Sequence, residues 1–234
     1  MAEQPELWVV DAGTVPYRDA LALQHAVRDA RLRGDVPDVL LLLEHPPVYT
    51  RGRRTGPGEL PMGEAWYAQR GIEIVDVDRG GKVTYHGPGQ LVGYPIVRID
   101  DVLGFVALLE EAMADVLAQE GVTARGRSAE GRDVTGVWVE DRKIGSIGLH
   151  VTRGVTTHGF ALNADLDLEP FAWVVPCGLQ VPMTSIAAER GTAVDARCVR
   201  RRAAHALAQR MGRRQRLVSA ARLRATVQAD VAAA

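Results

Sequence analysis

The stretch Val39-Leu40-Leu41-Leu42-Leu43, followed by Glu44-His45-Pro46-Pro47, decides the fold class. Five consecutive aliphatic residues are typical of a β-strand that is buried on both faces, and the two prolines end it. A strand of this kind lies in a sheet that is covered by helices on both sides. The stretch therefore predicts an α/β protein.

Helices and strands are expected on either side of this run. Apolar residues recur at three and four positions over 17–33 and 104–120, which predicts two amphipathic helices, and a third helix is expected over 194–210. Strands are expected over 7–10, 72–77, 90–97, 136–140, 143–151 and 155–162, and a loop over 50–63. Because no repeat or linker interrupts the pattern, we predict one α/β domain over residues 1–212. An Ala/Arg-rich tail over 213–234 is expected to form a weak helix or to fray.

Composition excludes several classes of protein. The 234 residues include 28 basic and 29 acidic ones, so that the formal net charge of −1 points to neither nucleic acid nor a membrane surface as a partner. The N-terminus lacks the features of a signal peptide, and no apolar run is long enough to span a membrane. The two cysteines, Cys177 and Cys198, are far apart and form no disulfide framework. We therefore expect a cytoplasmic protein with reduced thiols.

The densest run of glycine lies in Asp78-Arg79-Gly80-Gly81-Lys82-Val83-Thr84-Tyr85-His86-Gly87-Pro88-Gly89-Gln90. Glycines within a strand often mark the close approach of a ligand or of another backbone, although an ordinary turn-rich loop fits equally well. The segment has neither P-loop nor dinucleotide-binding spacing. Nearby, Arg51-Gly52-Arg53-Arg54-Thr55-Gly56 has three arginines that either hold an anion or are solvated.

A second unusual segment, Lys143-Ile144-Gly145-Ser146-Ile147-Gly148-Leu149, places a lysine at the head of a strand with two glycines. Lysine at a strand end is usually solvated. Alternatively, the glycines form a slot that His158-Gly159-Phe160 lines from a neighbouring strand. The six histidines show no ligand spacing and there is no HExxH or CxxC motif, so we predict no metal. Cys198 is expected to be a structural thiol, whereas Cys177, in WVVPCGL, is either a small buried residue or a nucleophile.

Taken in order, LLLLEHPPVYT (40–50), DRGGKVTYHGPGQLVGYPI (78–96), RKIGSIGLHV (142–151), THGFALN (157–163), PCGL (176–179) and MTSI (183–186) resemble the lipoyl(octanoyl) transferases. The resemblance implies a single domain with a mixed β-sheet flanked by helices, as in the biotin and lipoate ligase catalytic domains. It also implies the transfer of an octanoyl group from acyl carrier protein to a lysine of apo lipoyl domains. Such domains occur in 2-oxoacid dehydrogenases and in the glycine cleavage H protein.

The resemblance further implies roles for individual residues. Cys177 would be the acyl-thioester nucleophile and Lys143 its acid/base partner. Substrate contacts are implied at Arg79, Gly80, Gly81, Lys82, Val83, Thr84, Tyr85, His86, Ser146, Ile147, Gly148, His158, Gly159 and Phe160. Many members have Gln where this chain has Lys82, so the role of that lysine stays open. Passing an acyl group from one thiol to another is nearly isoenergetic, so neither ATP nor a metal is expected.

Three alternatives remain open from the sequence. The first is an ATP-dependent lipoate or biotin ligase, because residues 51–55 are similar to the adenylate loop of biotin ligases; Thr50 and Thr55, however, replace its first and last glycines. The second is a non-catalytic acyl-binding module, and the third is an octanoyl transferase that works between lipoyl domains. For the transferase we expect a narrow apolar tunnel, since each buried methylene contributes roughly 0.8 kcal/mol.

Overall fold

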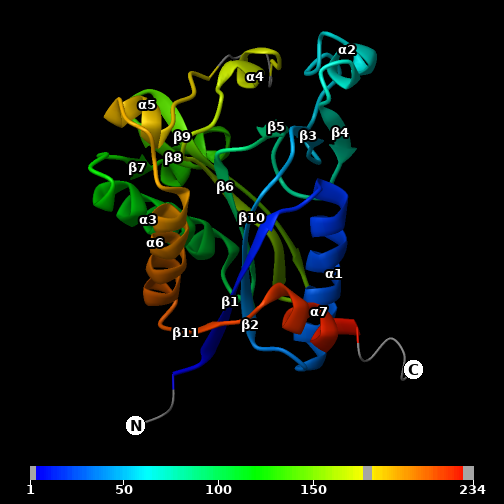
Figure 1. The fold of residues 1–234 in the computed structure, drawn as a ribbon, viewed down its shortest axis with the longest axis vertical. Coiled ribbons are helices and arrows are strands. Elements are labelled where there is room, and N and C mark those ends of the chain that lie inside the picture. Colours follow the sequence, from blue (N-terminus) through cyan, green and yellow to red (C-terminus); the bar gives the residue numbers. More distant parts are fainter. Residues whose placement is uncertain (1–3, 176–180, 229–234) are drawn as a thin grey trace.

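The protein is described by a computed structural model of residues 4–175 and 181–228, which form a mixed sheet between two layers of helices (Figure 1). The large sheet has the order β11-β1-β2-β6-β10-β9-β8-β7. Its strands are β1 (Glu6–Thr14), β2 (Asp38–Glu44), β6 (Gln90–Ile96), β7 (Arg125–Gly126), β8 (Val137–Val139), β9 (Arg142–Thr152), β10 (Val155–Asn163) and β11 (Arg214–Leu217). β11, β1 and β2 pair in parallel, and the pairs from β2 to β7 are antiparallel.

The aliphatic run that predicted the fold class forms β2, between β1 and β6 in the sheet. Leu40 and Leu42 pack into the core beneath α3 (Val102–Gln119) and α6 (Ala196–Arg210). Val39, Leu41 and Leu43 pack on the opposite face, beneath α1 (Tyr17–Arg33) and α7 (Ala220–Gln228). All five side chains are at most 1% exposed, which confirms the prediction of an α/β fold with a strand buried on both faces.

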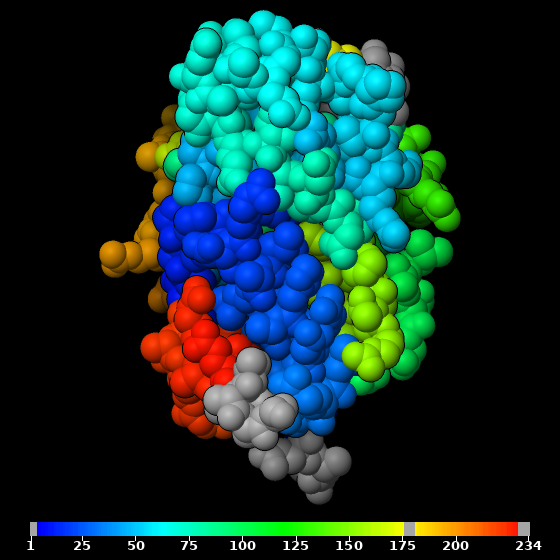
Figure 2. All heavy atoms as spheres, turned by 90° about the vertical axis from the view of Figure 1, so that its right-hand side faces the viewer, coloured from blue at the N-terminus to red at the C-terminus, as the bar shows by residue number. Residues whose placement is uncertain are grey.

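A smaller sheet with the order β4-β3-β5 caps one end of the molecule (Figures 1 and 2). Its strands are β3 (Val48–Arg51), β4 (Glu73–Asp76) and β5 (Val83–His86), and two short helices, α2 (Glu64–Ala68) and α4 (Glu169–Ala172), flank it. Tyr49, Tyr67 and Tyr85 form an aromatic core there, with ring centroids 5.2 Å (Tyr49–Tyr67) and 5.3 Å (Tyr49–Tyr85) apart. This cap holds the glycine-rich segment against the large sheet.

The chain after residue 212 adds two elements to the packed domain. β11 extends the sheet by pairing with β1, and α7 buries Leu223 (0% exposed) and Val227 (4% exposed) beside α1. Figure 2 shows α7 (red) lying against α1 (blue). The predicted boundary at residue 212 therefore does not mark the end of the packed structure. The described residues contain no helix long and apolar enough to cross a membrane.

Candidate active site

The glycine-rich segment lies directly on β9. The Gly80 amide donates to the Leu149 carbonyl at 3.0 Å, and a Cβ added to Gly148 would lie 3.1 Å from the Gly80 carbonyl oxygen and 3.1 Å from Arg79 Cδ. Glycine at position 148 thus permits this close approach. The structure therefore brings together Arg79, Gly80 and Gly148, and the space beside Gly148 is filled by another backbone.

The arginine-rich loop over residues 51–56 is locked to the same segment. The Arg53 amide donates to the Arg79 carbonyl at 3.1 Å, and the Arg54 amide to the Gly81 carbonyl at 3.0 Å. A Cβ on Gly52 would lie 2.6 Å from the Gly81 carbonyl oxygen, so only glycine fits at position 52. The two loops therefore form one rigid backbone unit.

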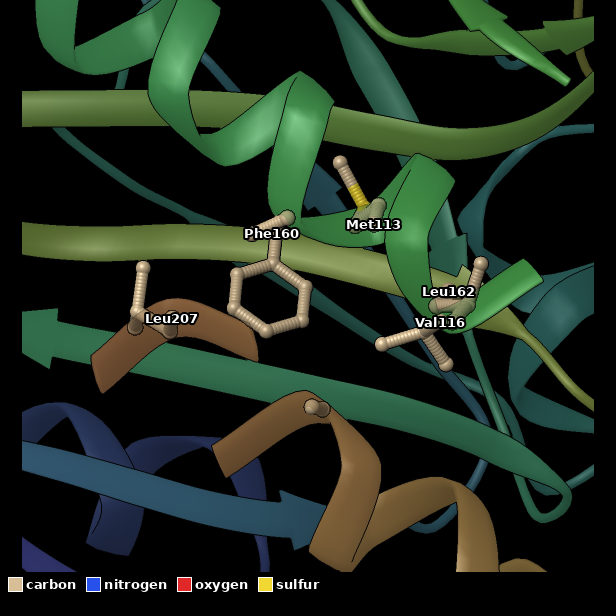
Figure 3. Close-up of a pocket in the computed structure, with 7 residues that line it drawn as sticks. Met113, Val116, Phe160, Leu162 and Leu207 are labelled. Atoms are coloured by element: carbon tan, nitrogen blue, oxygen red, sulfur yellow. The ribbon is translucent and has the colours of Figure 1, made fainter. Parts of the chain in front are cut away.

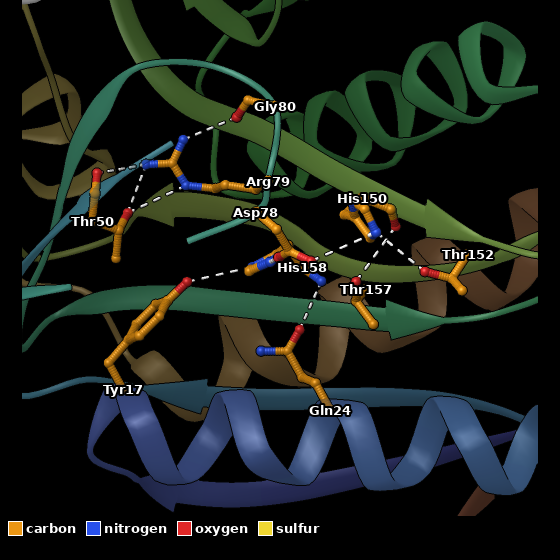
Figure 4. A network of polar contacts seen from close by, with 10 residues as sticks. All are labelled: Tyr17, Gln24, Thr50, Asp78, Arg79, Gly80, His150, Thr152, Thr157 and His158. Carbon is orange, nitrogen blue, oxygen red and sulfur yellow. Dashed lines mark hydrogen bonds and ion pairs between the residues drawn. The ribbon is translucent and has the colours of Figure 1, made fainter. Parts of the chain in front are cut away.

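Arg79 is a buried cation, with 7% of its surface exposed. Its Nη2 donates to the carbonyl of Thr50 at 2.8 Å and to Oγ1 of Thr50 at 2.6 Å, and its Nη1 donates to the Gly80 carbonyl at 3.0 Å (Figure 4). In the part of the chain that the structure describes, no carboxylate pairs with it. Burial lowers the pKa of Arg79. A guanidinium in this setting favours a negative charge placed nearby.

His158 occupies a strained position within β10. It is 1% exposed and has a φ of +58°, a left-handed conformation that is rare for a residue other than glycine. Its amide donates to Gln24 Oε1 at 2.7 Å, its Nε2 donates to Asp78 Oδ1 at 2.7 Å, and its Nδ1 accepts from the Tyr17 hydroxyl at 3.4 Å (Figure 4). The bond from His158 lowers the pKa of Asp78, and burial lowers the pKa of His158. Tyr17 and Gln24 of α1, together with Asp78, hold the strained backbone.

A chain of amides orients His86. His86 Nδ1 donates to Gln90 Oε1 at 2.6 Å, Gln90 Nε2 donates to Asn163 Oδ1 at 2.9 Å, and Asn163 Nδ2 donates to the Thr184 carbonyl at 2.9 Å. The Thr184 carbonyl can only accept, which fixes the orientation of the Asn163 and Gln90 side-chain amides. His86 must therefore carry a proton on Nδ1. Burial lowers the pKa of His86 well below its ordinary value. His86 is therefore a neutral imidazole that offers Nε2 as an acceptor.

Lys143, at the start of β9, is held by main-chain and aromatic groups. Its Nζ donates to the Thr135 carbonyl at 2.7 Å and lies 5.3 Å from the centroid of the Trp138 ring. Burial lowers the pKa of Lys143 to about 8, and the charge of Glu110 acts in the opposite direction. An amine with that pKa exists in both protonation states near neutral pH, as an acid/base group requires.

Cys177 lies outside the described residues, so its role stays a prediction. The chain on both sides of the gap is described: the Val175 amide donates to the Glu59 carbonyl at 3.1 Å, and the Pro182 carbonyl accepts from the Lys143 amide at 2.8 Å. Pro182 follows Cys177 by five residues, a length of chain that spans at most about 17 Å. Cys198, expected to be a structural thiol, is partly exposed in the first turn of α6, where its Sγ donates to Asp195 Oδ2 at 3.3 Å.

Two of the implied substrate contacts, Ile147 and Phe160, have side chains on the α3/α6 face of the sheet, away from Arg79. Figure 3 shows Phe160 among core side chains of α3 and α6, which line a cavity of about 10 Å³. This volume fits about one water and not an eight-carbon chain, so the expected acyl tunnel stays a prediction.

The remaining implied contacts lie around the same segment. Ser146 and Gly148 pair across the sheet with Ala161 and Gly159. Val83, Thr84 and Tyr85 form β5, and Lys82 Nζ lies 3.9 Å from Asp133 Oδ1. Within the described residues, His, Cys, Asp and Glu form no group of three that could hold a metal ion.

The architecture is that of the lipoate and biotin ligase catalytic domains. A putative lipoate protein ligase from T. acidophilum with bound lipoic acid superposes with a TM-score of 0.76 at 16% identity, over 97% of this chain and 94% of that one. Lipoate-protein ligase A bound with ATP gives a TM-score of 0.75 at 17% identity, covering 97% and 94%. A biotin protein ligase from Aquifex aeolicus gives 0.50 at 9% identity, covering 89% and 70%. At these identities the likeness shows the fold alone.

Sequence comparisons are more specific. Residues 16–208 match the lipoyl protein ligase A/B catalytic domain. The octanoyltransferase of Mycolicibacterium smegmatis is 50% identical, over 78% of this chain and 79% of that protein. The octanoyltransferase of Desulfotalea psychrophila is 46% identical, over 83% and 89%. The chain belongs to the octanoyltransferases of the lipoyl protein ligase A/B family and is an acyltransferase.

Proposed function

We propose that this protein transfers an octanoyl group from octanoyl-acyl carrier protein to a specific lysine of apo lipoyl domains, through a thioester on Cys177. The observation that carries the proposal is Lys143, a partly buried lysine with a pKa of about 8. Its main chain is bonded to Pro182 and Thr184, which follow Cys177 by five and seven residues. A base in that position suits the activation of a thiol that precedes Pro182 by five residues.

The reaction has two balanced steps. In the first, neutral Lys143 takes the proton of the Cys177 thiol, the thiolate attacks the donor thioester carbonyl, and the carbon–sulfur bond to pantetheine breaks. The Lys143 ammonium then protonates the departing sulfur. In the second, the amine of the target lysine attacks the Cys177 thioester, Lys143 accepts the proton that the amine loses, and Cys177 leaves as the amide forms. Neither step consumes ATP or needs a metal.

The glycine-rich segment would hold the acyl donor. Gly148 lets the Gly80 carbonyl and the Arg79 side chain lie directly on β9, and Arg79 supplies a buried positive charge there. His86 Nε2 supplies a neutral acceptor for a donor group of the substrate. These features support a role for the segment from Arg79 to His86, and for Ser146, Gly148, His158 and Gly159, in substrate binding.

We further propose the lipoyl domains of 2-oxoacid dehydrogenases and of the glycine cleavage H protein as acceptors, in the cytoplasm. A solved T. acidophilum relative is described as a bipartite lipoate protein ligase with its E2 lipoyl domain, which supports a lipoyl-domain acceptor. That relative is 16% identical to this chain, so the acceptor must be tested directly.

The decisive experiment is intact mass spectrometry after incubation with octanoyl-acyl carrier protein. We expect one octanoyl adduct that hydroxylamine removes, that Cys177→Ala abolishes and that the matched control Cys198→Ala retains. Lys143→Met should slow its formation about 100-fold or more. An adduct that persists in Cys177→Ala contradicts the thioester. Acyl transfer from free octanoate with ATP and pyrophosphate release identifies a ligase, and transfer only from octanoylated H protein identifies a transferase between lipoyl domains.

A further inference from the structure

Glu110 is a buried carboxylate that no part of the proposed reaction yet uses. It lies in the middle of α3, beside Gly126 of β7 and Gly136, which precedes β8, and is 4% exposed. Its Oε1 accepts from the amides of Ser128 at 3.0 Å and of Gly136 at 2.7 Å, and its Oε2 accepts from the Ser128 hydroxyl at 2.6 Å. Because every partner donates, the geometry fits the ionised carboxylate.

The backbone around Glu110 is shaped to let it approach. A Cβ on Gly126 would lie 2.4 Å from Glu110 Oε2, so any larger residue at position 126 would displace the carboxylate. Gly136 has a φ of +129°, and a Cβ there would lie 2.7 Å from Lys143 Cε and 3.3 Å from Lys143 Nζ. Gly136 therefore contacts the carboxylate of Glu110 through its amide and the side chain of Lys143 through its α-carbon.

The other charged groups on the elements around Lys143 are engaged elsewhere. Arg127, which stacks on Trp138, pairs with Glu130; Asp133 pairs with Arg54 and lies 3.9 Å from Lys82; Arg142 pairs with Glu140 and Glu189. Asp141, in the turn before β9, is exposed, so that in the described part of the chain Glu110 is the buried carboxylate of this cluster without an ion pair.

We propose that Glu110 is a positioning residue for Lys143: it fixes the Gly136 amide, and with it the Thr135 carbonyl that receives the Lys143 ammonium, and it supplies the compensating negative charge. The inference rests on the acid/base role proposed for Lys143. Its physical reason is that burial favours the neutral amine of Lys143, and the negative charge of Glu110 opposes this effect. A neutral amine can take the proton of a thiol, but only the ammonium can protonate a departing sulfur. Glu110 keeps both forms accessible.

The sequence makes a direct measurement possible, because Lys82 and Lys143 are its only lysines. Protein labelled with ¹³C-lysine has two side-chain signals, and Lys82→Arg assigns the one that remains to Lys143. We would follow the Lys143 ¹³Cε shift against pH in the wild type, in Glu110→Gln and in Glu111→Gln. Glu111 is the matched control because it removes the same charge from α3 at an exposed site, where it contacts Arg210.

We expect the Lys143 midpoint to fall from about pH 8 in the wild type by about one pH unit in Glu110→Gln. In Glu111→Gln it should stay unchanged. An equal midpoint in both variants and the wild type overturns the proposal, as does an upward shift. If thermal melting shows that Glu110→Gln does not fold, Glu110→Asp carries the test, since it keeps the charge but withdraws it by one methylene. In Glu110→Asp we expect the Lys143 midpoint to lie between the wild-type value and the value expected for Glu110→Gln. A midpoint equal to that of the wild type overturns the proposal. The measurement uses no acyl donor, so its failure is distinct from failure to form an octanoyl adduct.

Discussion

Replacing Lys143 with Met should slow acyl transfer about 100-fold or more and at the same time stabilise the protein. The lowering of the Lys143 pKa from 10.5 to about 8 corresponds to roughly 3 kcal/mol that opposes folding while the lysine is charged. Methionine has a similar length and no charge, so it removes this term. The Thr135 carbonyl then loses its hydrogen-bond donor and the Trp138 ring loses its cation. These two losses together destabilise the folded protein by about 1–2 kcal/mol. We therefore expect a net gain of about 1–2 kcal/mol at pH 7.

The pH dependence of that gain identifies its cause. The pKa of Lys143 in the folded state lies below its unfolded value, so between about pH 8 and 10.5 the unfolded chain binds more protons. Wild-type stability should therefore rise with pH across this window relative to the variant. The destabilising effect of the charge is fully present below pH 8 and absent above 10.5.

Urea unfolding followed by tryptophan fluorescence, at pH 7 and at pH 10, measures both effects. Lys82→Met is the control, because it removes the other lysine of the chain. If Lys143→Met is less stable than the wild type by the same amount at both pH values, Lys143 has an ordinary pKa and the reasoning fails.

Three further perturbations test the acid/base role of Lys143, the packing of Phe160 and the packing of α7. Because the pKa of Lys143 is about 8, the rate of thioester formation should rise about fivefold from pH 7 to pH 8 and level off above pH 9. A rate that does not change over this range excludes Lys143 as the base. Gly93→Ala places a Cβ 2.2 Å from the Phe160 ring, so urea unfolding should show a free energy of unfolding that is lower by about 1–3 kcal/mol. Adding Phe160→Leu should restore part of this free energy. Additive losses in the double variant would contradict the contact. Leu223→Ala should lower the unfolding free energy by about 2–4 kcal/mol, whereas Leu217→Ala, at an 81% exposed site, should leave it unchanged.

Much of the fold could be predicted because its signals are local. The helix expected over 17–33 has those same bounds, and Gly34 ends it in the left-handed conformation. By contrast, β11 is a run of Arg-Gln-Arg-Leu that forms a strand only because β1 lies beside it, and α7 buries just two side chains. Non-local pairing of this kind leaves no periodic pattern to read.

The candidate site likewise contains residues that the sequence predicts and residues that it does not. Segments 79–86 and 143–148 stand out in the sequence because glycine is rare within strands, and the structure brings Arg79 and Gly80 onto Gly148. Glu110, Gln24 and Asn163 were not predicted as site residues. Each is a polar residue whose burial follows from the packing of distant elements, and in sequence each looks like an ordinary helix or strand residue.

The groups at the centre of the site each oppose folding. Arg79 is a buried cation without a carboxylate partner in the described chain, Lys143 is a partly buried amine with a lowered pKa, and His158 has a strained backbone. They persist because several elements anchor each one, so their positions vary little during a reaction. Arg79 in particular has no carboxylate partner in the described chain, and a buried positive charge of this kind would favour the negative charge that develops on oxygen in the tetrahedral intermediates of acyl transfer. The same desolvation that lowers stability is therefore the electrostatic basis that we propose for catalysis.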